Sequence, residues 1–175
     1  KQAWQEFQPV TLAPSSYELK LPDPDRVRDL VAREQKILLE KSLERVIESY
    51  RAIVASDPEN ENAHMQIAII YAKYGLYEGA NAELDKILEK NQNSSAAYNN
   101  RGNIYYSKGD LERAQEAYAQ AERLDPSDGG IKMNLALAAY QNGQMAMARE
   151  KYQQAAKLNK DITGKYETFS KLLSR

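Results

Sequence analysis

Two asparagines one helical turn apart, Asn99 and Asn103, are the side chains of this sequence that come nearest to a recognisable chemistry. Each amide offers a hydrogen-bond donor and an acceptor, and a spacing of four residues places both on one face of a helix. Such a pair can hydrogen-bond the backbone of an extended peptide without reading its side chains. The chemistry that these residues favour is therefore recognition and not bond breaking.

Residues that could catalyse a reaction or hold a metal are scarce. His64 is the only histidine, the chain has no cysteine, and no glycine-rich phosphate loop follows a predicted strand. General acid–base catalysis needs titrating groups paired in a pocket, and a metal site needs several ligands. We therefore predict no enzymatic activity, no catalytic residue, no metal and no cofactor, and we expect His64 to be a half-exposed helix residue.

Charge and hydropathy narrow the range of partners. The net charge is −1, whereas a nucleic-acid binder needs a basic face that neutralises phosphates, so we expect no nucleic-acid partner. The sequence has no run of about eighteen apolar residues, the length that a helix needs to span a membrane. The chain begins at Lys1 without a methionine or an apolar leader, so we expect an excised domain or a processed chain. Cytoplasm and a bacterial periplasm or cell envelope stay open as locations, and a bacterial source is our interpretation of the regular short turns.

The sequence repeats itself with a period of 34 residues. Glycine recurs as Gly75, Gly109 and Gly143, and each of these positions lies between two amphipathic stretches. Further columns at the same period hold small or aromatic residues: Ala80, Ala114 and Ala148; Ala68, Gly102 and Ala136; Leu84, Tyr118 and Tyr152. The pattern predicts pairs of helices joined by tight glycine turns, with small residues where the paired helices approach each other.

These columns resemble the tetratricopeptide repeat (TPR) family, whose unit is a helix–turn–helix of this length. The best copy spans residues 95–128 and departs from the family at Arg101, where leucine is preferred; the resemblance extends over residues 27–162. The matching signature positions are Tyr98, Gly102, Tyr105, Ala114, Tyr118, Ala121 and Pro126. The resemblance implies an all-α fold, a right-handed superhelical α-solenoid of three to four units, which binds proteins or peptides on its concave side.

Domain organisation follows from the repeat register. Residues 60–94, 95–128 and 129–160 are predicted to be TPR units, and residues 161–175 a C-terminal capping helix. Residues 1–25 hold four of the six prolines, which disfavour helix, so this stretch is predicted to be an extended linker or arm.

Residues 26–59 allow two interpretations. In the repeat register they form a degenerate first repeat, whose turn position holds Lys41 in place of glycine. Because no residue in this stretch breaks a helix, one long helix over residues 26–56 is the alternative. The sequence leaves both open.

The resemblance also implies which residues lie on the concave side, because the first helix of each unit lines it. The partner-binding candidates are Met65, Ile69, Lys73, Asn99, Asn103, Tyr106, Met133, Leu137, Tyr140 and Gln141. The apolar members supply adaptable area for hydrophobic anchors, or they simply complete the packing. The basic residues with which TPR co-chaperones hold a C-terminal carboxylate are absent from the matching columns, so we exclude that ligand.

We therefore predict a non-catalytic protein–protein interaction scaffold that binds a peptide or helix of a partner in the concave groove. The alternative is a self-assembly module, a homo-oligomer in which residues 1–25 or the end helix pack onto another copy. This alternative is motivated by the apolar side chains of the N-terminal segment, which need a surface against which to pack: Trp4, Phe7 and the alternating apolar residues of 17–21. A third interpretation is the substrate-recruiting arm of a larger enzyme.

Overall fold

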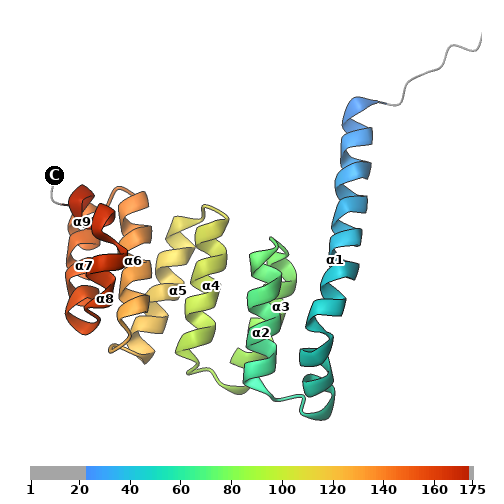
Figure 1. Cartoon of the computed structure of the whole chain (residues 1–175), viewed down its shortest axis with the longest axis horizontal. Helices are drawn as coiled ribbons and strands as arrows, with labels where there is room; N and C mark the ends of the chain where they lie inside the picture. Colours follow the sequence, from blue (N-terminus) through green and yellow to red (C-terminus); the bar gives the residue numbers. More distant parts are fainter. Residues whose placement is uncertain (1–22, 174–175) are drawn as a thin grey trace, which may run out of the picture. The chain divides into compact units, whose positions relative to one another are not determined.

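The computed structural model describes residues 23–173, and the regular elements in this part of the chain are α-helices (Figure 1). The fold is the predicted all-α solenoid. The helices are α1 (Pro24–Ser56), α2 (Glu61–Lys73), α3 (Tyr77–Lys90), α4 (Ser95–Ser107), α5 (Leu111–Leu124), α6 (Gly129–Gln141), α7 (Met145–Leu158), α8 (Asp161–Lys165) and α9 (Glu167–Leu173). None of these helices combines the length and the apolarity that crossing a bilayer requires.

The chain divides into two compact units, Lys1–Ser42 and Leu43–Arg175, and each is described by itself. The first contains the N-terminal part of α1. In the second, α2 lies against α3, α4 against α5 and α6 against α7, and successive pairs meet through α3 with α4 and through α5 with α6. The second unit is thus a row of helix pairs in which each pair contacts its neighbours, as in other repeat arrays.

The two helices of each pair are joined by a turn that needs glycine. Gly75, Gly109 and Gly143 have φ angles of 75°, 79° and 74°, in the left-handed region that a side chain with a Cβ disfavours. The amide of Gly109 donates to the carbonyl of Tyr106 at 3.0 Å, and the other two glycines make the same bond to the third residue before them. The predicted glycine turns are confirmed.

Small residues allow the paired helices to approach closely. Gly102 of α4 is buried beneath the ring of Tyr118 from α5, and Ala114 of α5 has no exposed surface. The Tyr118 hydroxyl donates to Asn103 Oδ1 at 2.8 Å, which ties the ring to α4. The small columns therefore make room for the aromatic residues that fill the space between the helices.

α1 is a single helix from Pro24 to Ser56. Of the two interpretations that the sequence left open, the structure agrees with one long helix and not with a degenerate first repeat. Lys41 stands 34 residues before Gly75 and lies inside this helix. Because a lysine disfavours the positive φ that the glycine turns require, the chain continues as helix where the repeats reverse. Leu43 and Ile47, in the C-terminal half of α1, are buried in the second unit.

The N-terminal boundary of α1 corrects one expectation. Residues 1–25 were predicted to be extended, but Pro24 and Asp25 form the first turn of α1. Proline is well suited to this position, since its fixed φ is helical and the missing N–H would have no partner there. Asp23 Oδ1 accepts a hydrogen bond from the Asp25 amide at 3.0 Å. The other residues of the predicted arm, Trp4 and Phe7 among them, lie outside the described residues.

The predicted C-terminal capping helix is present as two short helices, α8 and α9, with a break at Tyr166. The break follows Gly164, and glycine is a poor helix former. Ile162, Phe169 and Leu173 are buried in one cluster with residues of α6 and α7. These two helices therefore cover apolar surface that the last helix pair would otherwise expose.

We predict that Gly102→Ala destabilises the second unit by about 1–3 kcal/mol, the usual range for overpacking a core. The new Cβ would overlap ring carbons of Tyr118, which is 2% exposed and held by its hydroxyl, so the ring cannot move aside easily. Chemical denaturation followed by circular dichroism measures the loss.

Gly164→Ala is the matched control, because its added Cβ would meet no atom within 4 Å. It should leave the free energy of unfolding unchanged or slightly raised, since alanine is the better helix former. Equal stability of the two variants would contradict the close approach described for α4 and α5.

Candidate functional site

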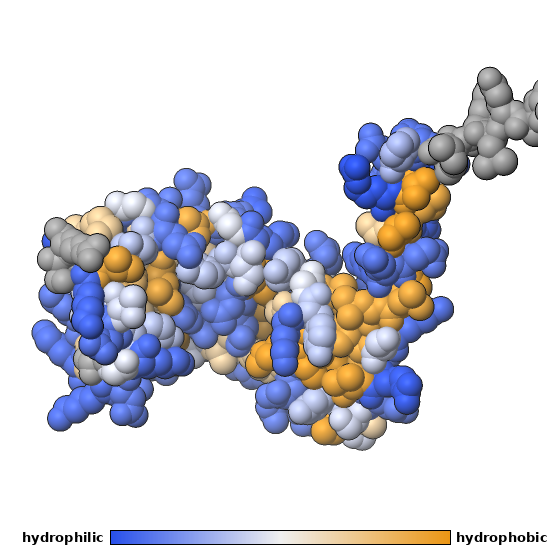
Figure 2. Space-filling model, turned by 45° about the horizontal axis from the view of Figure 1, so that its top comes forward, coloured by the Kyte–Doolittle hydropathy of each residue, from blue (hydrophilic) through white to orange (hydrophobic). Residues whose placement is uncertain are grey.

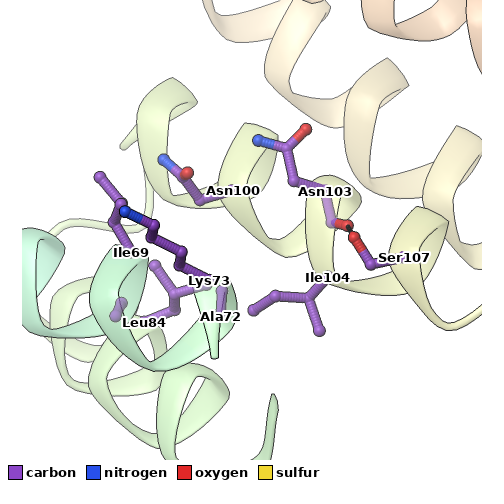
Figure 3. A pocket seen from close by; sticks show the side chains of 9 residues that line it. Ile69, Ala72, Lys73, Leu84, Asn100, Asn103, Ile104 and Ser107 are labelled. Atoms are coloured by element: carbon purple, nitrogen blue, oxygen red, sulfur yellow. Dashed lines mark hydrogen bonds between the residues drawn. The ribbon is translucent and has the colours of Figure 1, made fainter. Parts of the chain in front are cut away.

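Side chains of α2 and α4 border a hollow of about 220 Å³ in the second unit (Figure 3). Leu84 and Ile104, which are almost fully buried, form its apolar base, and Ile69 and Lys73 approach from α2. The complete lining consists of Ala68, Ile69, Ala72, Lys73, Leu84, Asn100, Asn103, Ile104 and Ser107. Its shape suits an apolar side chain held beneath a polar rim.

A second hollow of about 250 Å³ lies between α4 and α6 and continues the first. It is lined by Asn103, Tyr106, Ser107, Tyr118, Asn134 and Leu137. Asn103 and Ser107 border both hollows. We call the two hollows together the groove; it runs across α2, α4 and α6, the helices that the repeat pattern placed on the concave side.

A third hollow, of about 290 Å³, is bordered by α4, the start of α6 and the segment around α8. Its lining consists of Asn99, Asp128, Gly130, Ile131, Met133, Asn134, Asn159, Asp161, Ile162, Lys165 and Tyr166. Asn134 belongs to this hollow and to the groove. The predicted asparagine pair is therefore divided, because Asn99 borders the third hollow while Asn103 borders the groove.

Amide hydrogen bonds connect the asparagines of α4 and α6. Asn134 Nδ2 donates to Asn99 Oδ1 at 2.9 Å and lies 3.4 Å from Asn103 Oδ1, which also accepts from the Tyr118 hydroxyl. The two carbonyl oxygens thus serve the protein's own packing. Within residues 23–173, the Nδ2 groups of Asn99 and Asn103 donate to no protein acceptor, so the pair offers donors and not acceptors to a ligand.

The structure brings some of the predicted binding residues together and buries others. Those that line the groove are Ile69, Lys73, Asn103, Tyr106 and Leu137. Met65 and Met133 are buried, at 9% and 1% exposed. Tyr140 packs edge-on against Phe169, with ring centroids 5.2 Å apart, and Gln141 is exposed outside the groove. Met65, Met133 and Tyr140 therefore contribute mainly to packing, the simpler of the two roles that the sequence allowed.

Two polar residues of this region, Asn100 and Asn134, were missing from the predicted set. Asn100 Nδ2 donates to Met65 Sδ at 3.3 Å, and Asn134 Nδ2 makes the corresponding bond to Asn99. Each bond joins a residue to the position 35 before it, in the preceding repeat. Because Asn100 and Asn134 are themselves 34 residues apart, the recurrence of asparagine in one column is the signal that could have identified them.

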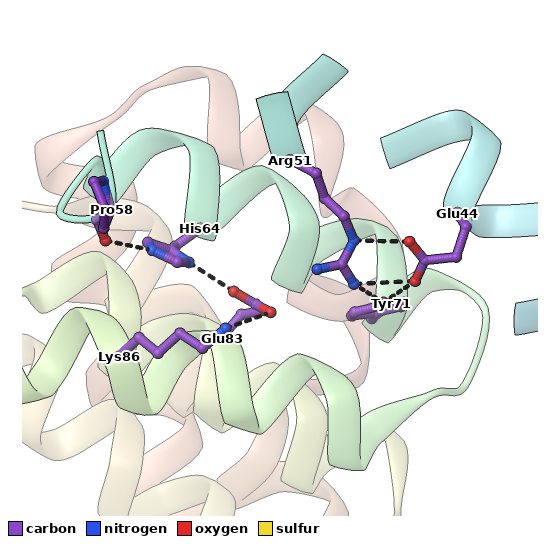
Figure 4. A network of polar contacts seen from close by, with 7 residues as sticks. All are labelled: Glu44, Arg51, Pro58, His64, Tyr71, Glu83 and Lys86. Atoms are coloured by element: carbon purple, nitrogen blue, oxygen red, sulfur yellow. Dashed lines mark hydrogen bonds and ion pairs between the residues drawn. The ribbon is translucent and has the colours of Figure 1, made fainter. Parts of the chain in front are cut away.

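The expectation that His64 is half-exposed is wrong. His64 is 4% exposed; its Nδ1 lies 2.6 Å from Glu83 Oε2 and its Nε2 lies 2.9 Å from the Pro58 carbonyl (Figure 4). Lys86 donates to the other oxygen of Glu83 at 3.0 Å. Because both ring nitrogens are engaged inside the protein, His64 joins α2 to α3 and has no nitrogen left for a ligand.

A second network in Figure 4 joins α1 to α2. Arg51 donates to both carboxylate oxygens of Glu44, at 2.7 and 3.0 Å, and to the Tyr71 hydroxyl at 2.8 Å. The hydrogen bonds from Arg51 hold the pKa of Glu44 below its usual value. Burial, and then the hydrogen bond to Glu44, raise the pKa of Tyr71, so its hydroxyl stays protonated. This network fastens the C-terminal half of α1 to the array.

A third polar cluster joins α5, α6 and α7. Glu122 accepts from Lys132 at 2.5 Å and from Lys151 at 2.6 Å, and the three side chains are 10–18% exposed. Burial works to raise the pKa of Glu122, but the two lysines outweigh it and hold the pKa below its usual value. Among residues 23–173, no three acidic or histidine side chains are grouped as metal ligands.

Comparisons with known proteins agree with the repeat architecture. Models of the tetratricopeptide repeat family match residues 38–101 and residues 99–161. The chain is similar to DnaJ homolog subfamily C member 3 of Bos taurus, with 26% identity over 98 residues, 56% of this chain and 19% of that protein. It is also similar to the type IV pilus assembly protein PilF of Pseudomonas aeruginosa, with 26% identity over 116 residues, 63% of this chain and 45% of that protein. The chain thus spans less than half the length of either relative.

Solved structures share the fold. A structure of Pseudomonas aeruginosa pilF matches with a TM-score of 0.62 at 22% identity, over 83% of this chain and 72% of that chain. YrrB, described as a TPR protein with an unusual peptide-binding site, matches with a TM-score of 0.61 at 24% identity, over 67% and 61%. MamA matches with a TM-score of 0.59 at 20% identity, over 77% and 83%.

We predict that Glu122→Gln lowers the free energy of unfolding at neutral pH by about 1–3 kcal/mol, because Lys132 and Lys151 lose their charged acceptor. A carboxyl whose pKa is lowered by folding stabilises the protein above its unfolded pKa, and this contribution disappears as the pH falls through the folded pKa. The difference between wild type and variant should therefore shrink below about pH 4. Urea titrations at a series of pH values measure it.

Glu59→Gln serves as the control, since Glu59 pairs with Lys90 at the surface and both side chains are more than 60% exposed. Exposed pairs contribute little, so this variant should stay within about 0.5 kcal/mol of wild type. A pH-independent difference for Glu122→Gln would contradict the assigned ion-pair cluster.

Proposed function

Because the chain belongs to the tetratricopeptide repeat family, we propose that it is a non-catalytic scaffold that binds an extended peptide segment of a partner protein in the groove. The family and the fold neighbours support a protein-interaction scaffold. An extended peptide is the ligand that best fits two hollows in succession. A residue in an extended chain rises by about 3.3 Å and alternate side chains point the same way, so apolar side chains could enter both hollows.

The observation that carries this proposal is the unused donor of Asn103 between two apolar hollows. Its Oδ1 is occupied by Tyr118 and Asn134, which fixes the amide in one orientation. Its Nδ2 can then donate a hydrogen bond to a peptide carbonyl, and little side-chain entropy is left to lose on binding. A hydrogen bond to the peptide backbone is independent of the peptide's side chains, so it gives affinity without specificity.

Specificity would come from the side chains around the donor. Ile69, Leu84 and Ile104 in the first hollow, and Tyr106 and Leu137 in the second, favour apolar anchors of moderate size. Lys73 at the rim of the first hollow favours an acidic residue beside one of these anchors. YrrB is itself described as having a peptide-binding site, and this likeness of fold agrees with the class of ligand.

We predict that Asn103→Asp weakens peptide binding by tenfold or more. Aspartate keeps the oxygen that accepts from Tyr118 and Asn134, but it replaces the donor by an acceptor that repels a peptide carbonyl. A lost hydrogen bond and this repulsion together exceed about 1.4 kcal/mol, which corresponds to a tenfold change in affinity. The probe is a displayed library of random linear peptides selected on the wild-type protein, and affinities are then measured by fluorescence anisotropy.

Asn93→Asp is the charge-matched control, because Asn93 is exposed and lines none of the three hollows. The selected peptides should bind this variant as they bind wild type, and circular dichroism should show equal helicity for both variants. Peptides that bind Asn103→Asp with unchanged affinity, or a selection that enriches no peptide, would refute a peptide site in the groove.

A further inference from the structure

One face of α1 is exposed where the corresponding positions of the later helix pairs are buried. Val46 is 57% exposed, whereas its repeat equivalents have no exposed surface: Ala80, Ala114 and Ala148. Ile53 is 42% exposed, whereas its equivalents are at most 3% exposed: Ile87, Ala121 and Ala155. The hydrophobic clusters that hold these residues include side chains from the first helix of the same pair: Tyr71 with Ala80 and Ile87, Tyr105 with Ala114, and Ala136 with Ala148 and Ala155. The face of α1 that carries Val46 and Ile53 therefore lacks the covering helix that the equivalent positions have in the later pairs.

In the repeat register, the segment that would cover this face is the N-terminal half of α1 itself. Residues 26–40 precede residues 43–56 just as α2 precedes α3, and their apolar side chains are also uncovered: Val27, Leu30, Val31 and Leu38 are 38–62% exposed. Apolar residues gather around the C-terminal part of α1, and others lie farther along this helix (Figure 2). A continuous helix cannot lie alongside itself, so neither set can cover the other within one chain.

We propose that α1 pairs with α1 of a second copy of this chain, so that residues 26–40 of each copy cover the Val46–Ile53 face of the other. The exchange replaces the one intrachain helix pair of each copy by two interchain pairs in the dimer, which is a domain swap. α1 spans 33 residues, Pro24–Ser56, and Lys41 stands near its midpoint. Two antiparallel copies related by a two-fold axis through this midpoint would therefore overlap along their whole length.

The repeats supply the register of this pairing. Tyr71 packs against the hydrophobic cluster that contains Ala80, and its equivalent Tyr105 packs against the cluster that contains Ala114. The same arrangement 34 residues earlier would place Ile37 of one copy near Val46 of the other. Gly102 lies beneath the ring of Tyr118, and the equivalent positions two repeats earlier are Glu34 and Tyr50. The pairing would therefore place Glu34 of one copy against Tyr50 of the other.

Glu34 is the residue that is least suited to the close approach of the two helices. The equivalent positions hold the small residues Ala68, Gly102 and Ala136, all of which are buried. A glutamate at this point of close approach loses water and keeps the helices apart, although the Tyr50 hydroxyl can donate to it. Glu34→Ala should therefore strengthen the pairing, which gives the proposal a variant that gains as well as variants that lose.

Light scattering coupled to size exclusion tests the proposal on the full chain. Wild type should have the mass of two copies, and Val46→Asp should halve it because a charge cannot occupy the covered face. Lys41→Gly, which restores the turn residue, should also lower the mass, because each chain can then form its own helix pair. Glu34→Ala should keep the mass of two copies to at least tenfold higher dilution than wild type.

Glu48→Asp controls for substitution within α1, since Glu48 and its repeat equivalents Ala82, Glu116 and Glu150 are all exposed. It should leave the mass at two copies. A wild-type mass of one copy, or two copies retained by Val46→Asp, would overturn the proposal.

Disulfide trapping identifies which surfaces meet. The natural chain has no cysteine, so Ile37→Cys with Val46→Cys introduces the only thiols. These positions are nine residues apart on one helix, about 13 Å, which a disulfide within one straight helix cannot span. Oxidation should give a covalent dimer, and Ile37→Cys with Glu48→Cys should give none. A disulfide within one chain, or no disulfide, would overturn the exchange, whatever the outcome of the peptide experiment.

Discussion

The reversal of the chain between paired helices is the constraint on which the rest of the structure depends. It requires a positive φ at one position in each repeat, and Gly75, Gly109 and Gly143 provide it. Once the chain has reversed, the two helices lie close enough that small residues must face aromatic ones, as Gly102 faces Tyr118. Where the position holds Lys41, the helix continues and its apolar face stays uncovered. Each of these three helix pairs thus has glycine at its turn, whereas α1, which does not reverse, has lysine there.

The groove is a consequence of how successive pairs stack. Asn100 reaches Met65 and Asn134 reaches Asn99, each across 35 residues, so the same contact recurs between neighbouring repeats. This stacking places α2, α4 and α6 side by side and occupies the oxygens of Asn99 and Asn103. The donors that are left, set among apolar side chains, are the groups to which we propose that a peptide backbone binds.

Sequence alone predicted the features that repeat with a fixed period. The helix pairs, the glycine turns and the small-residue columns depend on local spacing, and the structure confirms them. His64 could not be placed in this way, because its partner Glu83 lies on the next helix and the other members of its column, Tyr98 and Lys132, have different chemistry. The division of Asn99 and Asn103 between two hollows also escaped prediction, since it depends on α8, which lies beyond the regular repeats. For α1, the sequence showed that Lys41 stands at the position of the turn glycine. The repeat spacing alone did not show whether residues 26–56 form a helix pair or one helix.

The most direct test of this account is the stability of two semisynthetic proteins that differ only in the handedness of an alanine in place of Gly109. A Cβ at this position in the L form meets no atom within 4 Å, so a loss of stability with L-alanine reports the backbone conformation and not a clash. D-alanine favours the observed φ of 79° and should raise the free energy of unfolding by about 0.5–1 kcal/mol relative to glycine. L-alanine should lower it by about 1–2 kcal/mol. Equal stability of the two proteins would contradict the claim that a positive φ at the turn determines the helix pairs.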